Sequence, residues 1–248
     1  MSRLFYNLGR MVGPNVRRAK WIWQSVTGTE ADSIKVENDV GRDLAREIRR
    51  QLNPCLQPRA DEMLNKIGSR LAACVVNRFR TFSFETVECH EPNAFALPGG
   101  FVFVTGSLVE LCEWHEDEIA FILAHEMSHV IRGHAIHRFI SNSAISAAVR
   151  AAPVRGVLSG WLQKVGVQFL ESAYSQDLEF EADRFGVCLA STAKYDPRGS
   201  MRLLARLAEI NQPPDRLNLG GYFSSHPAGE ARISNINRML GNKRLTTK

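Results

Sequence analysis

The sequence predicts an α+β fold that is mainly helical and carries one small β-sheet. In most of the chain, apolar residues recur at three- and four-residue spacing among charges, which is the helical period. Two short segments between residues 82 and 105 are instead rich in aromatic and β-branched residues, as strands are. One predicted helix near the middle of the chain is apolar on every side, and such a helix runs through a protein core. A chain of 248 residues, 44% of them hydrophobic, is large enough to bury that core.

The first 35 residues are predicted to form a basic arm. Five cations precede the first acidic residue, Glu30: Arg3, Arg10, Arg17, Arg18 and Lys20. Residues 1–29 can therefore lie peripherally on an anionic membrane surface, or they can pack on the body of the protein. In a eukaryotic protein this segment also fits a mitochondrial transit peptide. We divide the chain into this arm, residues 1–35, and one globular domain, residues 36–248.

Two helices are predicted before the sheet, from Val40 to Leu52 and from Ala60 to Phe79, and prolines separate them. Phe82 to Cys89 alternates between apolar and polar residues, and Phe101 to Thr105 is a short apolar run. Both are therefore predicted as strands. Between them, Pro98-Gly99-Gly100 indicates a turn where the backbone can approach a ligand closely.

The rest of the chain is predicted to be largely helical. A short helix from Ser107 to Trp114 precedes a long one from Glu116 to Ile140, whose acidic first turn the helix dipole favours. Residues 141–167 are weakly patterned and are expected to form a helical hairpin or a loop. Further helices are predicted at Leu170–Ala193, Pro197–Ile210 and Ala228–Leu240.

The long helix carries His125-Glu126-Met127-Ser128-His129, which is the H-E-x-x-H pattern. Residues four apart share one face of a helix, so both imidazoles can reach one metal ion. Glu126 projects beside them, where it can take a proton from a water molecule that zinc has activated. Two histidines and a glutamate are costly to bury in an apolar helix unless something such as a metal compensates them. The pattern therefore predicts one catalytic zinc ion per chain.

A third zinc ligand is expected from residues 179–183 (EFEAD). Zinc proteases that add a third histidine downstream of H-E-x-x-H are excluded, because Arg132 and Ala135 stand at the last two positions of that longer pattern. Glu179 and Asp183 share a helix face, so one can bind zinc while the other accepts the free N–H of a ligand histidine. Glu181 points away and is interpreted as a solvated charge, which makes Glu179 the preferred ligand.

The remaining histidines are assigned from their position. His134 and His137 lie beyond the metal-binding face and are interpreted as structural. His226 lies in a loop that leads into a helix and is followed by Arg232. We predict that His226 is catalytic and donates a hydrogen bond to the oxyanion of the transition state, a role that Arg232 can also fill.

Several motifs in order resemble the gluzincin peptidase family that contains the CAAX prenyl protease, the heat-shock protease HtpX and the mitochondrial Oma-type stress protease. The resemblance extends from about residue 60 to residue 240. The motifs are Asn93–Gly100 with Val104-Thr105, His125–His134, Glu179–Asp183, Ser225-His226-Pro227 and Arg232-Ile233.

The resemblance implies a zincin-type metallopeptidase domain and a role for each site residue. Glu126 would be the general base. Asp183 would accept a hydrogen bond from a ligand histidine, through the ring nitrogen that does not bind the metal. The strand from Phe101 to Val104 would be a sheet edge that pairs with an extended peptide substrate. The implied zinc ligands are His125, His129 and Glu179.

The predicted function is that of a zinc-dependent endopeptidase that cleaves polypeptides, in keeping with protein quality control. The alternatives are a zinc-stabilised binding or chaperone-like module without turnover, and a hydrolase of non-peptide amides. Glu126 argues against the binding module, because a structural zinc site needs no base and is usually closed by four protein ligands.

Composition narrows the location and the partners. No apolar stretch approaches the roughly 20 residues of a membrane-spanning helix, and no secretory signal is recognised. Five scattered cysteines without a CxxC pair indicate buried thiols in a reducing compartment. We expect a cytoplasmic protein, with mitochondria as the alternative in a eukaryote. The net charge of +5 is modest, and no nucleic-acid partner is expected.

Overall fold

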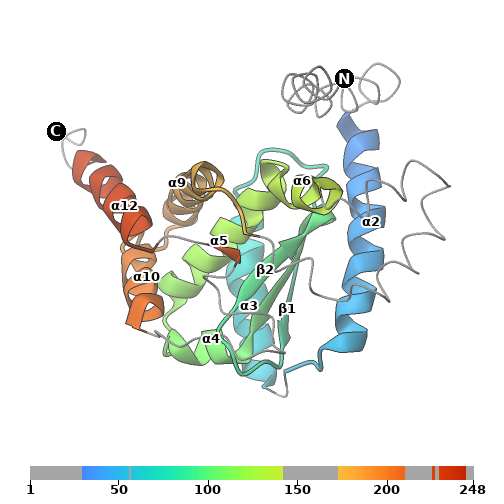
Figure 1. Cartoon of the computed structure of the whole chain (residues 1–248), viewed down its shortest axis with the longest axis horizontal. Helices are drawn as coiled ribbons and strands as arrows, with labels where there is room; N and C mark the ends of the chain where they lie inside the picture. The colour runs from blue at the N-terminus through green and yellow to red at the C-terminus, as the bar shows by residue number, and fades with distance from the viewer. Residues whose placement is uncertain (1–29, 56, 142–172, 210–224, 227–228, 244–248) are drawn as a thin grey trace, which may run out of the picture.

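The computed structural model describes residues 30–55, 57–141, 173–209, 225–226 and 229–243. Their helices and strands form layers around a three-stranded sheet (Figure 1). Helix α2 (Glu30–Gln51) packs on one face of the sheet, and helices α3 (Pro58–Ala72) and α5 (Glu116–Ile131) pack on the other. The α+β class predicted from the sequence is confirmed.

The strands pair in an order that differs from their order in the chain. They are β1 (Ser83–Val87), β2 (Ala94–Leu97) and β3 (Phe101–Thr105), and the sheet order is β1-β3-β2. Strand β3 pairs in parallel with β1 and antiparallel with β2. The prediction that Phe101–Val104 forms an edge is therefore wrong, because both sides of this strand are already paired. Among the described residues, the edge strands of the sheet are β1 and β2.

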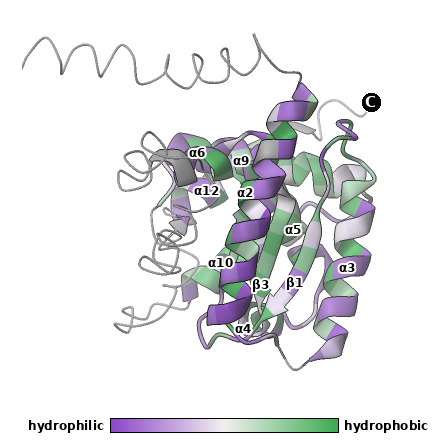
Figure 2. Cartoon of the chain, turned by 90° about the vertical axis from the view of Figure 1, so that its right-hand side faces the viewer, coloured by the Kyte–Doolittle hydropathy of each residue, from purple (hydrophilic) through white to green (hydrophobic). Residues whose placement is uncertain are grey.

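Alternation along the strands divides the core between the two faces of the sheet. The residues that pack with Val40, Leu44 and Ile48 of α2 are Val87, Phe95, Leu97 and Phe103. The residues that pack with α3 and α5 are Phe84, Ala94, Ala96, Val102 and Val104. The outward side of α2 is hydrophilic in Figure 2, as expected for a helix that covers one side of a sheet.

The observed bounds correct several predicted elements near the N-terminus. Helix α2 begins at Glu30 instead of Val40, and α3 ends at Ala72 instead of Phe79. Residues 30–35 of the predicted arm therefore belong to α2, and residues 1–29 lie outside the described residues. Strand β2 was missed, because its four residues (AFAL) show no alternation and lead directly into Pro98-Gly99-Gly100.

The two glycines after β2 allow a close approach to the chain's own backbone. Both have positive φ, +78° at Gly99 and +88° at Gly100. A Cβ atom on Gly99 would lie 2.7 Å from Cα of Asn38 in α2, and one on Gly100 would lie 2.0 Å from the carbonyl oxygen of Thr81. The first contact packs this turn against α2, and the second packs it against the segment just before β1. The predicted approach of a ligand to this turn is thus replaced by packing within the protein.

Helix α5 begins after a short helix, α4 (Gly106–Leu111), and its start is tied to α10 (Gly199–Glu209). Glu118 is fully buried in the acidic first turn of α5. Its carboxylate lies 3.2 Å from Nε of Arg202 and 3.1 Å from Nε of Arg206 in α10. The first turn therefore does more than complement the helix dipole, since it anchors the core helix to the C-terminal layer.

The long helix predicted from Glu116 to Ile140 is in fact two helices. Gly133 has φ +76° and separates α5 from α6 (His134–Ser141). A left-handed residue ends a helix, and glycine adopts that conformation without steric cost. The chain therefore changes direction after α5, and His134 comes to lie against His129. The prediction that α5 runs through the core is confirmed, because the side chains from Glu118 to Val130 are all buried.

Helix α9 (Gln176–Thr192) lies against α5, and α12 (Gly229–Lys243) packs on α9 and α10. These helices correspond to the predicted C-terminal elements, whereas residues 142–172 and 210–224 lie outside the described part of the chain. A Cβ atom on Gly186 of α9 would lie 3.1 Å from the backbone nitrogen of His125. Glycine at this position thus lets the two helix backbones approach closely beside a predicted metal ligand. No helix in the described ranges has the length and apolarity of a membrane span.

Candidate metal centre

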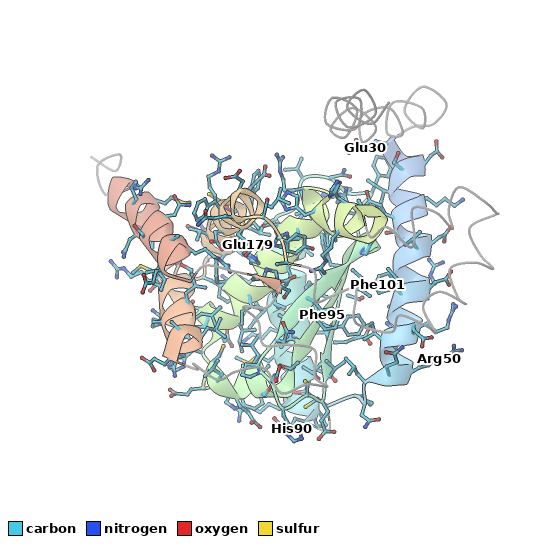
Figure 3. All side chains as sticks on the ribbon, in the orientation of Figure 1. Glu30, Arg50, His90, Phe95, Phe101 and Glu179 are labelled. Atoms are coloured by element: carbon cyan, nitrogen blue, oxygen red, sulfur yellow. The ribbon has the colours of Figure 1, made fainter. Side chains whose placement is uncertain are left out.

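Helices α5 and α9 bring the three predicted ligands to one buried point. The Nε2 atoms of His125 and His129 are 3.0 Å apart. Glu179 Oε1 lies 3.3 Å from Nε2 of His129, and its Oε2 lies 3.6 Å from Nε2 of His125. All three side chains are fully buried. Glu179 lies where α9 meets α5 (Figure 3), so two helices distant in the sequence form one potential metal site.

The outer nitrogen of His125 shows that this imidazole is suited to bind a metal. Its Nδ1 lies 3.0 Å from Oδ1 of Asp183. Burial would raise the pKa of Asp183, but the charge and hydrogen bonds of Arg232 and the hydrogen bond with His125 hold this pKa below its usual value. An ionised carboxylate only accepts hydrogen bonds, so Nδ1 of His125 carries the proton. The lone pair of Nε2 then faces the site, as a metal ligand requires.

The outer nitrogen of His129 is held differently. Its Nδ1 lies 3.1 Å from Nδ1 of His134, whose Nε2 lies 3.2 Å from Oε2 of Glu181. Arg132 also pairs with Glu181. Burial is the main reason that the pKa of His129 is well below its usual value, which keeps its imidazole neutral. His134 therefore contacts a predicted ligand, and Glu181 pairs with His134 and Arg132, so the interpretation of Glu181 as a solvated charge is wrong.

Arg232 of α12 joins the two carboxylates of the site from the side of the C-terminal layer. It is fully buried, and its Nε and Nη2 lie 2.9 and 2.7 Å from the two oxygens of Asp183. Its Nη1 lies 2.9 Å from Oε2 of Glu179. Burial would raise the pKa of Glu179, but the charge of His226 and hydrogen bonds with His129 and His226 lower it. A fully buried arginine needs such partners. The sequence had suggested Arg232 as a possible oxyanion donor, not as the partner of these two carboxylates.

Glu126 follows His125 on α5 and is almost completely buried, with 1% of its surface exposed. Its Oε1 accepts no hydrogen bond from the described residues and lies 3.4 Å from Nε2 of His226. A carboxylate with an unused acceptor beside the ligand group can take a proton from a water molecule there. The structure thus places the predicted base next to the predicted ligands.

His226 lies within the group of potential ligands and not apart from it. Its Nδ1 lies 3.0 Å from Oε1 of Glu179 and 3.4 Å from Nε2 of His125. The ligand atoms of all four residues, His226 included, lie within 4.8 Å of one another. Three imidazoles and a carboxylate form a donor set that suits a divalent transition metal.

Tyr174 is a residue of the site that sequence reasoning missed. Its ring stacks on the imidazole of His129, with centroids 3.9 Å apart and planes inclined by 15°. Its backbone N–H donates to the carbonyl of Ser225, which places it beside His226. Burial raises the pKa of Tyr174, so its hydroxyl is protonated, and Oη has no hydrogen-bond partner in the part of the chain that the structure describes. An aromatic residue just before the helix with Glu179 was the only sequence signal.

Comparisons with known proteins agree with this geometry. The chain is 36% identical over 151 residues to the mitochondrial metalloendopeptidase OMA1 of Schizosaccharomyces pombe. The aligned region covers 60% of this chain and 44% of that protein. It is also 30% identical over 220 residues to the beta-barrel assembly-enhancing protease of Yersinia pestis. Here the aligned region covers 82% of this chain and 43% of that protein. The chain thus spans less than half the length of either relative.

The family match extends over most of the globular domain. Residues 58–240 match peptidase family M48, in agreement with the range over which the motifs resemble gluzincins. The matched range contains every residue of the metal centre described above. This chain therefore belongs to peptidase family M48.

Proposed function

We propose that this protein is a zinc-dependent endopeptidase. The observation that carries the proposal is the convergence of two helices on one buried point, where His125, His129 and Glu179 turn their donor atoms toward each other beside Glu126. A site for substrate hydrolysis needs three protein ligands and a base, and these four residues supply them. Zinc bound there would polarise the peptide carbonyl and lower the pKa of a nearby water molecule.

Glu126 and His226 would perform the proton transfer and the stabilisation of charge. Glu126 would accept the proton of the attacking water through Oε1, which accepts no hydrogen bond from the residues that the structure describes. His226 would donate from Nε2, which lies on the Glu126 side of its ring. Arg232 is the weaker candidate for the oxyanion, because its guanidinium faces Asp183 and Glu179.

The substrate would be an unfolded or incompletely assembled polypeptide, as in protein quality control. The name of the Yersinia relative describes enhancement of β-barrel assembly and supports this class of substrate. An extended segment would pair with β2, the edge strand that contacts both α5 and α6. This placement replaces β3, whose two sides are occupied.

A second candidate function follows from the position of His226. Four residues offer ligand atoms, and a zinc ion held by four protein ligands is typical of a structural site. A permanently closed site would make the protein a zinc-stabilised binding module without turnover. Glu126 would then have no chemical role.

One experiment tests the proposal against this alternative. Purified protein loaded with zinc would be incubated with unfolded casein, with and without a chelator, and then with zinc restored. We expect cleavage that the chelator abolishes and zinc restores. Zinc-loaded protein that binds casein without cleaving it would support the binding module. Cleavage unaffected by the chelator would contradict both functions.

A further inference from the structure

Arg138 is a buried arginine that has no carboxylate partner within the described residues. It lies on α6 with 9% of its surface exposed, and its Nη1 is buried without a hydrogen-bond partner. By contrast, Arg232 is paired with Asp183 and Glu179, and the buried side chain of Arg80 is paired with Glu37. Burying a guanidinium without an anion is costly. Arg138 thus has an unused capacity to bind an anion.

This arginine lies one side chain away from the metal centre. Its guanidinium carbon is 4.4 Å from the centroid of the Tyr174 ring, and that ring stacks on His129 at 3.9 Å. The guanidinium carbon therefore lies at most about 8 Å from the His129 ring, which is two to three residues of an extended peptide at about 3.3 Å per residue. A polypeptide cleaved at the metal centre would have side chains within its reach.

Tyr174 adds a second unused donor at the same place. The residue is only 5% exposed, and its hydroxyl has no hydrogen-bond partner among the described residues. A guanidinium and a phenolic hydroxyl are both donors, and together they suit an acceptor that is negatively charged. Neither group is used in the proposed chemistry of Glu126 and His226.

We propose that Arg138 and Tyr174 form a subsite that binds a carboxylate of the polypeptide substrate, two to three residues from the cleaved bond. The inference rests on the proposed peptidase function and specifies its substrate: segments with an acidic residue near the cleavage site. The charge-assisted pair would favour glutamate over glutamine at one subsite on the order of tenfold. The competing explanation is that Arg138 only packs on the Tyr174 ring as a cation–π contact, without any effect on substrate choice.

The test uses a set of matched peptides with one cleavable bond. Glutamate is moved through the three positions on each side of that bond, and each peptide is paired with its glutamine counterpart. Every peptide is made with a free and with an amidated C-terminus, which separates a side-chain carboxylate from a terminal one. The ratio of kcat/KM between the glutamate and glutamine members of a pair cancels general effects on catalysis.

The first variant is Arg138→Met, which has a long side chain without a charge. The second is Arg138→Lys, which keeps the charge but lacks the planar guanidinium group. Arg238→Met, at an exposed position of α12, is the matched control. Zinc content and melting temperature are measured for each. Affinities of the same peptides for Glu126→Gln, and for Glu126→Gln combined with Arg138→Met, give a readout that does not require turnover.

We expect a glutamate preference of about tenfold at one position in the natural chain and in Arg238→Met. The preference should fall close to one in Arg138→Met and be intermediate in Arg138→Lys, in both kcat/KM and affinity. The same preference in Arg138→Met, or none in the natural chain, would overturn the subsite. Failure of the natural chain to cleave any peptide in a chelator-sensitive way would instead refute the peptidase function.

Discussion

Each of the three proposed ligands, His125, His129 and Glu179, has a partner on its outer side. Asp183 faces the second nitrogen of His125, and His134 faces that of His129. Arg232 faces the second oxygen of Glu179. Such partners fix the orientation of a ligand before the metal arrives. The spacing of residues on single helices predicted that His125, His129 and Glu179 would meet at one point, as they do. Partners such as Arg232 depend on how α12 packs and could not be predicted from spacing.

The roles of Glu179 and Glu181 can be separated by replacing each with alanine. Glu179→Ala removes an oxygen that lies 3.3 Å from Nε2 of His129, so we expect almost complete loss of zinc. Glu181→Ala affects the site only through His134, and we expect zinc retention to fall about tenfold at most. Zinc per chain after dialysis against a chelator measures both. Equal losses would remove the reason for naming Glu179 as the ligand.

His226→Ala should lower turnover, whereas Arg232→Ala should lower zinc retention and stability. If His226 acts on the transition state, its loss should lower turnover on the order of a hundredfold with little change in zinc content. Arg232→Ala leaves Asp183 and Glu179 buried without their cation, so zinc retention and melting temperature should both fall. The two variants should be compared for turnover, zinc and melting temperature. Zinc loss in His226→Ala would show that this residue is a fourth ligand instead.

Helices α5 and α9 meet at the candidate metal centre because Gly186 lets their backbones approach closely. The sequence pattern predicted which helices exist better than it predicted where they begin and end. The apolar segment of α5 was recognisable, since no face of it is polar. The break at Gly133 was not, because apolar residues and histidines continue beyond it in the same pattern. The start of α2 was missed for the opposite reason, because its first residues are mostly polar. Strand β2 was missed because only its pairing with β3 identifies it.

Gly186→Ala tests the close contact between α9 and α5. The added methyl group would lie 3.1 Å from the backbone nitrogen of His125, so the helices must separate by a few tenths of an ångström. We expect a lower melting temperature and weaker zinc retention, although alanine is favoured over glycine in a helix by up to about 1 kcal/mol. Gly241→Ala is the control, because nothing lies within 4 Å of its added Cβ. If the two variants behave alike, the contact has no role in the site.

At the scale of the whole molecule, the N-terminal segment, residues 1–29, precedes α2. Its contact with a membrane surface stays a prediction. Glu30 begins α2 at one end of the molecule (Figure 3), and Asn77 donates a hydrogen bond to it. Beside Asn77, the side chains of Val76 and Phe79 are 92% and 60% exposed. The basic segment 1–29 therefore joins the body next to two exposed apolar side chains, a combination that favours contact with an anionic membrane surface.

Deletion of residues 1–29 tests that contact. Cleavage of a short soluble peptide should be unchanged, because no residue of the metal centre lies in the deleted segment. Co-sedimentation with vesicles rich in phosphatidylserine should fall, whereas the low binding expected for phosphatidylcholine vesicles should stay the same. Unchanged sedimentation with the anionic vesicles would exclude residues 1–29 as the contact.

Glu126→Gln tests most directly whether Glu126 acts as the base while His125, His129 and Glu179 bind the metal. The amide keeps the shape of the side chain and cannot take a proton, while His125, His129 and Glu179 are unchanged. Zinc content and the rate of casein cleavage would be measured on the same preparations of the natural chain and the variant. The account predicts equal zinc in both and cleavage reduced at least a hundredfold in the variant. Cleavage at the natural rate, or loss of zinc together with activity, would contradict it.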